Sequence, residues 1–554
     1  MKKYIIVGGV AGGATTAARL RRLDEDSEII IFERGGEISF ANCGLPYYVG
    51  GVIGERDDLL LMTPRRFRNI FNVDVRVHSE VIGVDAAAKK VRVKTAEKEY
   101  EESFDALVLA PGAKALRPPI PGIDHKNILT LRNVPDADAL RDMVLRSENG
   151  SAAVIGGGFV GIEAAENLKE RGLDVTLVEA VPHILAPFDD DMAVLAEEEL
   201  RKHGIKLLLG SGVKEFAALD GGRVEVRLAD GTAVPADFVV LAIGVRPDTG
   251  FLAGSGIELG ERGHILVNEH MQTNYPYVYA VGDAAMTYDS QTGKAGTLAL
   301  AGPANRQGRL AADNIAGEKR KYPGFVGSSI IKVFDLTAAS TGKNERALRS
   351  EGLEYGRDYR FTVTYPASHA AYYPGAERFA LKMIFRMSDG KVLGAQAIGK
   401  SGADKCIDTM AAVIRMGGTV ENLMDLELAY APPFGAAKAP SNMTGYLAED
   451  IMRGLTDPVR PCEVEKEIEQ GAQVIDLRGK AMYEAGHIRG AVHIPTEKLR
   501  ENLAGLDKDK TYILACNTGL NGYFMERMLR QKGYKARDLM GGHTYYYQTL
   551  KGRK

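Results

Sequence analysis

Cysteine is scarce in this sequence, and the few cysteines do not occur in pairs. The 554 residues contain four of them, Cys43, Cys406, Cys462 and Cys516, and none belongs to a CxxC motif. This pattern excludes a disulfide framework and fits a reducing compartment, so we expect a cytoplasmic protein. Cys406 and Cys462 lie in no recognisable motif, and we interpret them as structural.

An excess of one charge and long apolar runs are also absent. The 70 Lys and Arg nearly balance the 73 Asp and Glu, and the net charge of -3 gives no reason to expect nucleic acid or an anionic membrane as a partner. No stretch approaches the roughly 18 apolar residues of a membrane span. The start of the chain superficially resembles a signal peptide, but glycines end its apolar run after Val7, so we interpret it as a strand, a turn and a helix.

An internal repeat gives the first indication of fold. The segment YIIVGGVAGG from Tyr4 is similar to AAVIGGGFVG from Ala152, and each combines a buried-type strand, a glycine-rich turn and a helix. Each is followed by a second strand that ends in an acid, Glu33 or Glu179. Two such βαβ units predict an α/β fold with two Rossmann-like dinucleotide-binding domains.

The first glycine turn, Gly8 to Gly13, would let phosphate approach bare N–H groups at a helix start. Val10 replaces the usual middle glycine, and the segment alone fits a plain βα turn equally well. The segment VYAVGDAA strengthens the nucleotide interpretation, because Asp283 after Gly282 can direct a carboxylate at a ribityl or pyrophosphate group. Asp283 could instead cap a helix.

The second turn carries the stronger signal. Gly156 to Gly161 fits G-x-G-x-x-G, lies between a strand and a helix, and is followed by Glu179. A carboxylate there accepts from a ribose 2′-hydroxyl and repels a 2′-phosphate, so NADH is favoured over NADPH.

The pattern of apolar residues, glycines and prolines along the chain suggests further domains. The segment FALKMIFRMSDGKVLGAQAIG indicates a hairpin around Asp389-Gly390 in an α+β domain, and LTDPVRPCEVE is the best linker candidate. The predicted organisation is a flavin domain in two parts, a nicotinamide nucleotide domain, a dimerisation domain, a linker and a small, independent α/β domain. The ranges are 1–115 and 246–324, 116–245, 325–453, 454–464 and 465–554.

Cys43 lies in SFANCGLPYY, where no second cysteine is near, so a CxxxxC dithiol is excluded. A lone cysteine at such a turn is by default a small buried residue. The motifs GGVAGG, SFANCGLPYY, GGGFVGIE, YAVGDAA and YAPPFGAAK together change this interpretation. With them, about 450 residues resemble the single-cysteine branch of the pyridine nucleotide-disulfide reductase family, and most of all coenzyme A disulfide reductases.

The resemblance implies FAD, NADH (with NADPH as the alternative) and coenzyme A, and a homodimer. It implies that a flavin reduces a mixed disulfide between Cys43 and coenzyme A. A sister branch that reduces oxygen or peroxide carries a histidine in the first glycine turn, where this chain has Ala11. The implied cofactor contacts are Gly8, Gly9, Val10, Ala11, Gly12, Glu33, Arg34, Asn42, Pro111, Gly112, Gly156, Gly158, Phe159, Val160, Gly161, Glu179, Gly244, Gly282, Asp283, Ala301 and Phe434.

Substrate contacts follow partly from helical spacing. Thr15, Arg19 and Arg22 share one face of the first helix, and guanidinium groups suit the phosphates of coenzyme A. Either Tyr372 or Tyr373, together with Tyr430, would be active-site tyrosines contributed across a dimer, and a phenol could donate a proton to a leaving thiolate. The family-like substrate positions are Ser39, Phe40, Asn42, Arg66, Asn305, Arg309, Tyr372 and Lys438. Any of the arginines could instead be an ordinary surface charge.

The C-terminal segments IDLR and GHIRGAVHIP resemble a rhodanese domain, with a strand ending at Cys516 and a helix expected from about Tyr523. The resemblance implies that Cys516 carries persulfide, and N–H groups at the helix start would lower the thiol pKa. Asn521 and Gly522 stand where Arg or Ser is frequent, which should weaken thiosulfate binding. An inactive module is the alternative.

The sequence therefore predicts an FAD- and NAD(P)H-dependent reductase of coenzyme A persulfide, polysulfide or coenzyme A disulfide, acting through Cys43 with a sulfur relay through Cys516. We predict no metal site. The alternatives are a plain coenzyme A disulfide reductase with an inactive tail, an NADH oxidase or peroxidase, and a redox-sensing binding protein without turnover.

Overall fold

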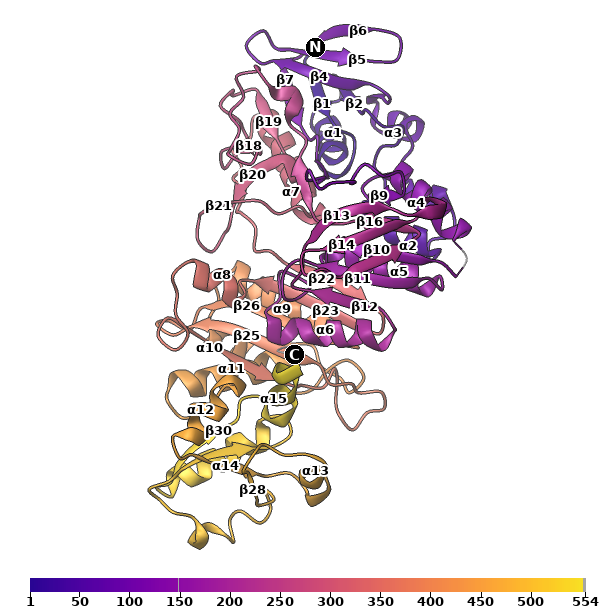
Figure 1. Cartoon of the computed structure of the whole chain (residues 1–554). Coiled ribbons are helices and arrows are strands. Elements are labelled where there is room, and N and C mark those ends of the chain that lie inside the picture. Colours follow the sequence, from indigo (N-terminus) through magenta and orange to yellow (C-terminus); the bar gives the residue numbers. More distant parts are fainter. Residues whose placement is uncertain (148, 552–554) are drawn as a thin grey trace. The chain divides into compact units, whose positions relative to one another are not determined.

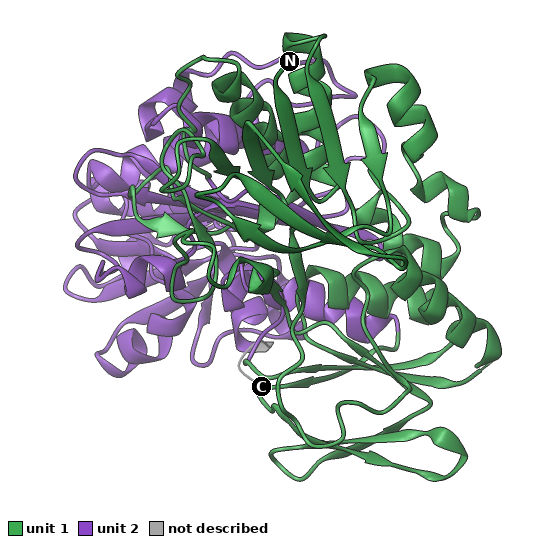
Figure 2. Ribbon diagram, turned by 90° about the horizontal axis from the view of Figure 1, so that it is seen from above, with its two compact units in different colours: residues 1–181, 204–325 green, residues 182–203, 326–554 purple. Residues whose placement is uncertain are grey.

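The computed structural model describes residues 1–147 and 149–551 and divides the chain into two compact units (Figure 2). Unit 1 contains residues 1–181 and 204–325, and unit 2 contains residues 182–203 and 326–554. Within the described residues, no helix combines the length and apolarity needed to cross a membrane.

Unit 1 is built on a five-stranded parallel sheet at the N-terminus (Figure 1). Its order is β19-β7-β1-β2-β3. Apart from the edge strand β3, the strands are nearly continuous apolar runs, as expected for a parallel sheet covered on both faces. Their bounds are Lys3–Val7 (β1), Glu28–Phe32 (β2), Asp74–Arg76 (β3), Ala106–Leu109 (β7) and Val278–Ala280 (β19).

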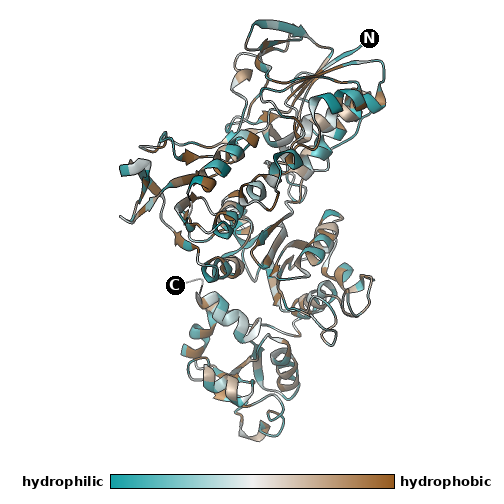
Figure 3. Ribbon diagram, turned by 90° about the vertical axis from the view of Figure 1, so that its right-hand side faces the viewer, coloured by the Kyte–Doolittle hydropathy of each residue, from teal (hydrophilic) through white to brown (hydrophobic). Residues whose placement is uncertain are grey.

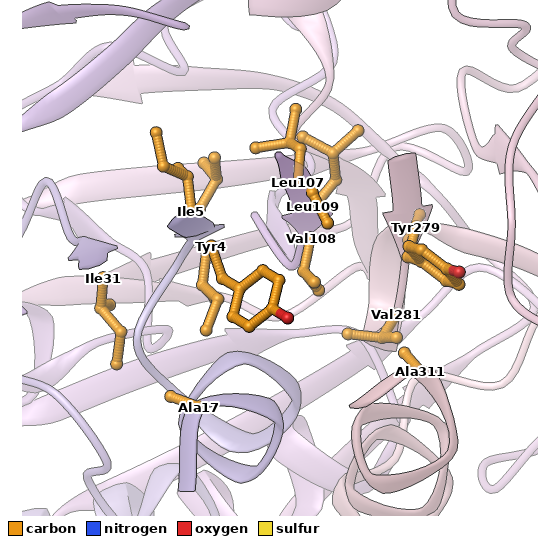
Figure 4. Packing of buried hydrophobic residues seen from close by; sticks show 14 of the residues in the cluster. Tyr4, Ile5, Ala17, Ile31, Leu107, Val108, Leu109, Tyr279, Val281 and Ala311 are labelled. Carbon is orange, nitrogen blue, oxygen red and sulfur yellow. The ribbon is translucent and has the colours of Figure 1, made fainter. Parts of the chain in front are cut away.

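Two helices, Ala11–Leu23 (α1) and Ala301–Ile315 (α7), cover this sheet and pack closely against each other. The Thr16 hydroxyl donates to the carbonyls of both Gly12 and Gly308, and a Cβ at Gly308 would lie 2.5 Å from the Gly12 carbonyl oxygen. Figure 4 shows apolar side chains from both helices and from β1, β2, β7 and β19 that meet in this core.

A second parallel sheet in unit 1 has the order β12-β11-β10-β16-β9. Its central strands are again almost entirely buried. The bounds are Ile128–Leu129 (β9), Ser151–Ile155 (β10), Asp174–Glu179 (β11), Lys206–Leu209 (β12) and Phe238–Leu241 (β16). The two parallel sheets confirm the predicted α/β class with two Rossmann-like domains.

The remaining strands of unit 1 form small sheets, and its other helices begin at caps or glycine turns. Thr63 and Asn133 accept backbone N–H bonds at the starts of α3 and α4. The helices are Leu45–Gly50 (α2), Pro64–Phe71 (α3), Val134–Arg146 (α4) and Phe159–Glu170 (α5). The small sheets contain Glu80–Asp85 (β4), Lys90–Lys94 (β5), Glu99–Ser103 (β6), Ala113–Ala115 (β8), Val213–Ala218 (β13), Val224–Leu228 (β14), Ala233–Ala236 (β15), Val245–Pro247 (β17), Ile265–Leu266 (β18), Ala285–Tyr288 (β20) and Ala295–Gly296 (β21).

Unit 2 begins with an antiparallel sheet of order β22-β23-β26-β25-β24. The predicted hairpin at Asp389-Gly390 joins β25 to β26 and is confirmed. The strands are Ser329–Val333 (β22), Leu336–Gly342 (β23), Tyr359–Thr364 (β24), Ala380–Arg386 (β25) and Val392–Gly399 (β26). The helices are Asp190–Lys202 (α6), Glu345–Ser350 (α8), Ala403–Arg415 (α9), Val420–Asp425 (α10) and Pro440–Met452 (α11).

The last part of unit 2 is a four-stranded parallel sheet of order β28-β27-β29-β30. In Figure 3, strands of the protein contain hydrophobic residues, drawn in brown, whereas the helices combine hydrophobic with hydrophilic residues, drawn in teal. The strands are Gln473–Asp476 (β27), Val492–His493 (β28), Thr511–Ala515 (β29) and Lys535–Asp538 (β30). The helices are Val464–Glu469 (α12), Lys480–Ala485 (α13), Leu520–Gln531 (α14) and Gly542–Lys551 (α15).

This last domain differs from the expected independent unit. Met540 and Tyr545 belong to the same buried cluster as Tyr359, Ile384 and Leu393 of the antiparallel sheet. The segment predicted as a linker is also fixed, because Val459 is fully buried and forms a bridge with Leu539. The two parts of unit 2 therefore share one buried cluster, in addition to the separate clusters within each part.

A buried charge cluster reinforces that shared apolar cluster. Lys382 has no exposed surface, and its Nζ lies 3.0 Å from Asp189, 2.7 Å from Asp191 and 2.8 Å from Glu345. The hydroxyl of Tyr545 on α15 donates to Asp191. Burial raises the pKa of Asp191, so the cluster contains a carboxyl that resists ionisation.

Candidate active site

The two glycine turns are built alike. Gly8 has φ +97° and Gly156 has φ +110°, backbone angles that favour glycine. A Cβ at Gly13 would lie 1.9 Å from the Gly8 carbonyl oxygen, and a Cβ at Gly161 would lie 1.9 Å from the Gly156 carbonyl oxygen. Both turns thus bring the first turn of a helix against the end of a strand, which only glycine allows.

The acids that follow the two turns also have matching positions. Glu33 accepts from the Gly9 N–H at 2.9 Å, and Glu179 accepts from the Gly157 N–H at 2.6 Å. The helices α1 and α5 begin without a side-chain cap or an acid in the first turn. Because their free N–H groups suit phosphate and the neighbouring carboxylates suit ribose hydroxyls, the residues fit a dinucleotide at each turn.

Other predicted cofactor positions lie at the carboxyl ends of the parallel strands, where open α/β sheets bind ligands. Gly112, Gly244 and Gly282 follow β7, β16 and β19 with φ between +66° and +111°. Arg34 is paired with Asp248, which also contacts Lys114 at 2.9 Å. Arg34 is therefore held by an acid in this structure.

Cys43 lies in a 3-10 turn, Asn42–Gly44, that leads into α2, and its side chain is exposed. Desolvation by the surrounding protein raises the pKa of the Cys43 thiol, and the Glu163 carboxylate raises it further. Arg132 acts in the opposite direction and Asp283 adds to the rise. Desolvation and three charged side chains thus determine the pKa of this thiol.

Arg132 organises the polar contacts beside Cys43. Its Nε donates to the Ala113 carbonyl at 2.8 Å, and its Nη2 lies 3.1 Å from Asp283. With its amide oriented to satisfy both neighbours, Asn42 accepts from Arg132 Nη1 at 2.6 Å and donates to the Arg132 carbonyl at 2.9 Å. Burial raises the pKa of Asp283, and Arg132 opposes that rise. The predicted Asn42 and Asp283 are therefore joined by a residue that the sequence did not indicate.

Glu163 is a second residue that the sequence analysis did not single out for the site. It projects from α5, the helix of the second glycine turn, and accepts from the Tyr47 hydroxyl at 3.3 Å. Burial raises the pKa of Glu163 to about 7. Its place in GGGFVGIE was the available signal, but only the fold brings it to the element that carries Cys43.

The predicted substrate face of α1 is partly occupied by internal contacts. Thr15 donates to Asn305 at 2.8 Å, and Arg19 Nε lies 2.6 Å from Asp313, which is fully buried. Arg22, Arg66 and Arg309 are exposed. Arg19 is therefore already paired, while the three exposed arginines stay candidates for phosphate.

The predicted tyrosines lie in unit 2. The hydroxyls of Tyr372 and Tyr430 are 3.1 Å apart, and this contact raises the pKa of Tyr372. Tyr373 instead packs edge-on against His369. The tyrosine pair thus contains Tyr372, and Phe434 and Lys438 are also exposed on this unit.

Cys516 is buried directly after β29, and the Gly519 N–H donates to its Sγ at 3.1 Å. Gly519 caps α14 with φ +93°, so the helix begins at Leu520, three residues before the expected start. The His543 N–H donates to the Cys516 carbonyl at 2.8 Å. Backbone N–H groups from two elements therefore fix this residue, one at its thiol and one at its carbonyl.

Comparisons with known proteins agree with this geometry. Residues 2–308 match the pyridine nucleotide-disulphide oxidoreductase family, residues 328–440 match its dimerisation domain, and residues 461–549 match the rhodanese-like domain. A coenzyme A disulfide reductase of Staphylococcus haemolyticus is 36% identical over 454 residues, which are 81% of this chain and all of the relative.

Two solved structures extend the likeness over both units. Reduced CoADR-RHD of Bacillus anthracis has 44% identity and a TM-score of 0.96, covering 100% of this chain and 99% of that one. A NAD-dependent persulfide reductase from A. fulgidus has 34% identity and a TM-score of 0.92, covering 98% of this chain and 100% of that one.

Proposed function

The chain belongs to the pyridine nucleotide-disulphide oxidoreductase family and is an NAD(P)H-dependent oxidoreductase, and from this premise we propose that it reduces a coenzyme A persulfide or polysulfide at Cys43. The observation that carries the proposal is the presence of two cysteine sites of different kinds in one chain. Cys43 lies beside the predicted flavin turn, and Cys516 lies at the loop of a rhodanese-like domain. A plain disulfide reductase needs no sulfur carrier.

The residues present fit FAD at the first glycine turn and NADH at the second. When bound, the pair supplies a hydride and a two-electron relay to the cysteine sulfur. Gly8, Gly13 and Glu33 would hold one nucleotide, and Gly156, Gly161 and Glu179 the other. The Glu179 carboxylate disfavours the 2′-phosphate of NADPH.

The chain's own groups prepare the thiol chemistry. Arg132 stabilises the Cys43 thiolate, which attacks the coenzyme A sulfur of a persulfide and releases hydrosulfide as the S–S bond breaks. Two electrons and one proton then return the mixed disulfide to Cys43 thiolate and free coenzyme A. Glu163, whose pKa is raised to about 7, can store that proton on its carboxyl and deliver it by way of the Tyr47 hydroxyl, which donates a hydrogen bond to Glu163. Cys516 would accept the outer sulfur from a donor and pass it on.

A cytoplasmic homodimer is part of the proposal. The match of residues 328–440 to a dimerisation domain supports the dimer, and four free cysteines support a reducing compartment. Tyr372 and Tyr430, exposed on unit 2, are the pair that we place at the partner's Cys43 site.

The test measures NADH consumption with polysulfide, coenzyme A persulfide, coenzyme A disulfide and peroxide in the wild type, Cys43→Ser and Cys516→Ser. We expect Cys43→Ser to lose at least about 10³-fold with all three sulfur substrates, because the nucleophile is removed. We expect Cys516→Ser to keep coenzyme A disulfide reduction and to lose turnover with polysulfide. Unchanged sulfur activity in Cys516→Ser rejects the relay, and preferred turnover of peroxide rejects the substrate class.

A further inference from the structure

The turn that leads into α15 lies directly behind Cys516. Gly542 has φ +62°, and a Cβ at this residue would lie 2.5 Å from the Cys516 carbonyl oxygen, so the close approach requires glycine. The His543 N–H donates to the Cys516 carbonyl at 2.8 Å, and the Thr544 N–H donates to the Asn517 carbonyl at 3.0 Å. The start of α15 therefore holds the backbone of the cysteine loop.

A strand holds the same loop from another direction. β27 ends at Asp476, which lies opposite Ala515 in the parallel pair of β27 and β29. The Leu477 N–H donates to the Ala515 carbonyl at 2.9 Å. Because Cys516 is the residue after Ala515, the loop begins between the end of β27 and the start of α15.

The side chain of His543 connects these two elements. It is 1% exposed, and its Nε2 lies 3.0 Å from Asp476 Oδ2. Asp476 is fully buried and is also held by Arg478, whose Nε donates to Oδ1 at 3.0 Å and whose Nη2 donates to Oδ2 at 2.7 Å. Burial opposes ionisation of Asp476, but the contacts with His543 and Arg478 hold the pKa of Asp476 well below its ordinary value. Asp476 is therefore a carboxylate beside the imidazole ring.

We propose that His543 is a positioning residue for Cys516, in which a ring anchored on Asp476 lets the backbone N–H fix the Cys516 carbonyl. The proposal rests on Cys516 acting as the sulfur carrier of the proposed function. Gly541 and Gly542, both with positive φ, precede His543, and their backbone is intrinsically free, so a side-chain anchor directly after them restricts the turn. A fixed loop keeps the thiol in the geometry of transfer, where small displacements of a reacting group are costly.

The rest of α15 has a separate anchor. The Tyr545 hydroxyl donates to Asp191, Gln548 Nε2 donates to the Asp191 carbonyl, and the Tyr365 hydroxyl donates to Gln548 Oε1 at 2.8 Å. None of these contacts involves His543. A substitution at His543 should therefore disturb the cysteine loop while α15 stays docked, which separates positioning from folding.

The first test follows the loading of Cys516 in the full-length holoenzyme without NADH. Coenzyme A persulfide gives its outer sulfur to the Cys516 thiolate, coenzyme A thiolate leaves, and mass spectrometry of the trapped Cys516 peptide follows the product. We expect the single-turnover rate constant to fall about 10- to 100-fold in His543→Leu, which has no polar contact, and to stay within about threefold in His543→Gln, whose amide can donate to Asp476.

Two features of this readout distinguish positioning from partial unfolding. A single-turnover rate constant does not depend on the fraction of active protein. The half-saturating persulfide concentration should stay within about twofold in both variants, because a side chain that is 1% exposed does not touch the donor. His487→Leu, at an exposed histidine of the same domain, is the matched control and should behave as the wild type.

Hydrogen exchange measures the anchor without any sulfur chemistry. The amides of His543 and Thr544 should exchange at least about tenfold faster in His543→Leu than in the wild type, and close to the wild-type rate in His543→Gln. His543→Asn is the second variant. Its amide is one methylene shorter than that of Gln and does not reach Asp476, so it should behave as His543→Leu.

The proposal is wrong if His543→Leu and His543→Asn keep both the exchange rates and the loading rate within twofold of the wild type. Equal losses in His543→Leu and His543→Gln would also overturn it, since the contact with Asp476 would then have no effect. Absence of persulfide on wild-type Cys516 would instead reject the sulfur relay, and hydrogen exchange would still decide whether His543 anchors the loop.

Discussion

The two cysteine sites differ in what surrounds the sulfur. Cys43 is exposed in a short turn; desolvation by the surrounding protein raises its pKa, and the charged side chains Glu163, Arg132 and Asp283 from other elements shift it further. Cys516 is buried, held by backbone N–H groups, and belongs to a core. The comparison teaches that desolvation and nearby single charges together control the first thiol, whereas the integrity of the fold controls the second. Substitutions at the two sites can test these two modes of control separately.

The largest effect is expected from Lys382→Met. Removing this cation leaves Asp189, Asp191 and Glu345 buried without the cation that they share, which typically costs about 3–5 kcal/mol. We expect a large fall in the thermal midpoint of unit 2 and faster alkylation of Cys516, because Tyr545 is anchored to Asp191. Differential scanning calorimetry and peptide mapping would measure both. Lys400→Met, at an exposed lysine of the same unit, is the control. Equal thermal midpoints of the two variants would contradict the claim that the buried charge cluster stabilises unit 2 and thereby protects Cys516.

Arg132→Met should weaken the Cys43 site by about 10- to 100-fold in kcat/KM for coenzyme A disulfide, because charged hydrogen bonds of this kind contribute roughly 1.5–3 kcal/mol. Arg132 lowers the pKa of Cys43, so alkylation of Cys43 at pH 7 should also slow. Arg132→Lys keeps the charge and should recover part of the alkylation rate. A Cys43 rate that is the same in all three proteins would show that side-chain charge does not control this thiol.

Glu163→Gln should change the pH dependence of Cys43. The pKa of Glu163 is raised to about 7, so its ionisation above that pH opposes the Cys43 thiolate. We expect Cys43 alkylation in Glu163→Gln to be about two- to fivefold faster above pH 7 and unchanged below pH 6. Glu170→Gln, at an exposed site on the same helix, should behave as the wild type.

The same substitution tests stability. Because the folded-state pKa of Glu163 lies above its ordinary value of 4.5, the folded state loses stability as pH rises from about 4.5 through 7. Glu163→Gln should therefore be more stable than the wild type above pH 7 by about 1–3 kcal/mol, and should show no such gain near pH 4. A gain that is equal at both pH values would assign the effect to packing.

The smallest effect is expected from Tyr372→Phe. The Tyr372–Tyr430 contact is exposed, so its loss should change stability by less than about 0.5 kcal/mol. If this pair serves the partner's Cys43, turnover with coenzyme A disulfide should fall about three- to tenfold. Tyr373→Phe is the matched control, and a larger loss from that variant would reverse the assignment.

Much of unit 1 was predictable because its signals are local. The glycine turns and the acids Glu33 and Glu179 are fixed by spacing along the chain, and the structure joins each acid to its own turn. Arg132 was not predictable, because it follows the short strand β9 and reaches Asn42 and Asp283 only through tertiary folding. The pairing of Arg19 with Asp313 was missed for the same reason.

In unit 2, the start of α14 and the segment around Val459 differ from the predictions. The helix after Cys516 was expected from about Tyr523, but it begins at Leu520, directly after Gly519 with its positive φ. The prolines near Leu455 suggested a free linker, whereas Val459 is buried and bridges to Leu539. Composition could not reveal that the two domains of this unit share a buried cluster.

That shared cluster bears on how the protein is made. Synthesis proceeds from the N-terminus, and domains generally fold as they emerge from the ribosome. The cluster around Tyr359, Ile384 and Leu393 is not complete until Met540 and Tyr545 have been added. While the rhodanese-like domain is being translated, the apolar side chains of this cluster on the antiparallel sheet therefore remain exposed, because Met540 and Tyr545 have not yet been added. We expect this exposed cluster to be a chaperone-binding site during translation, because the final piece of one domain lies at the far end of another.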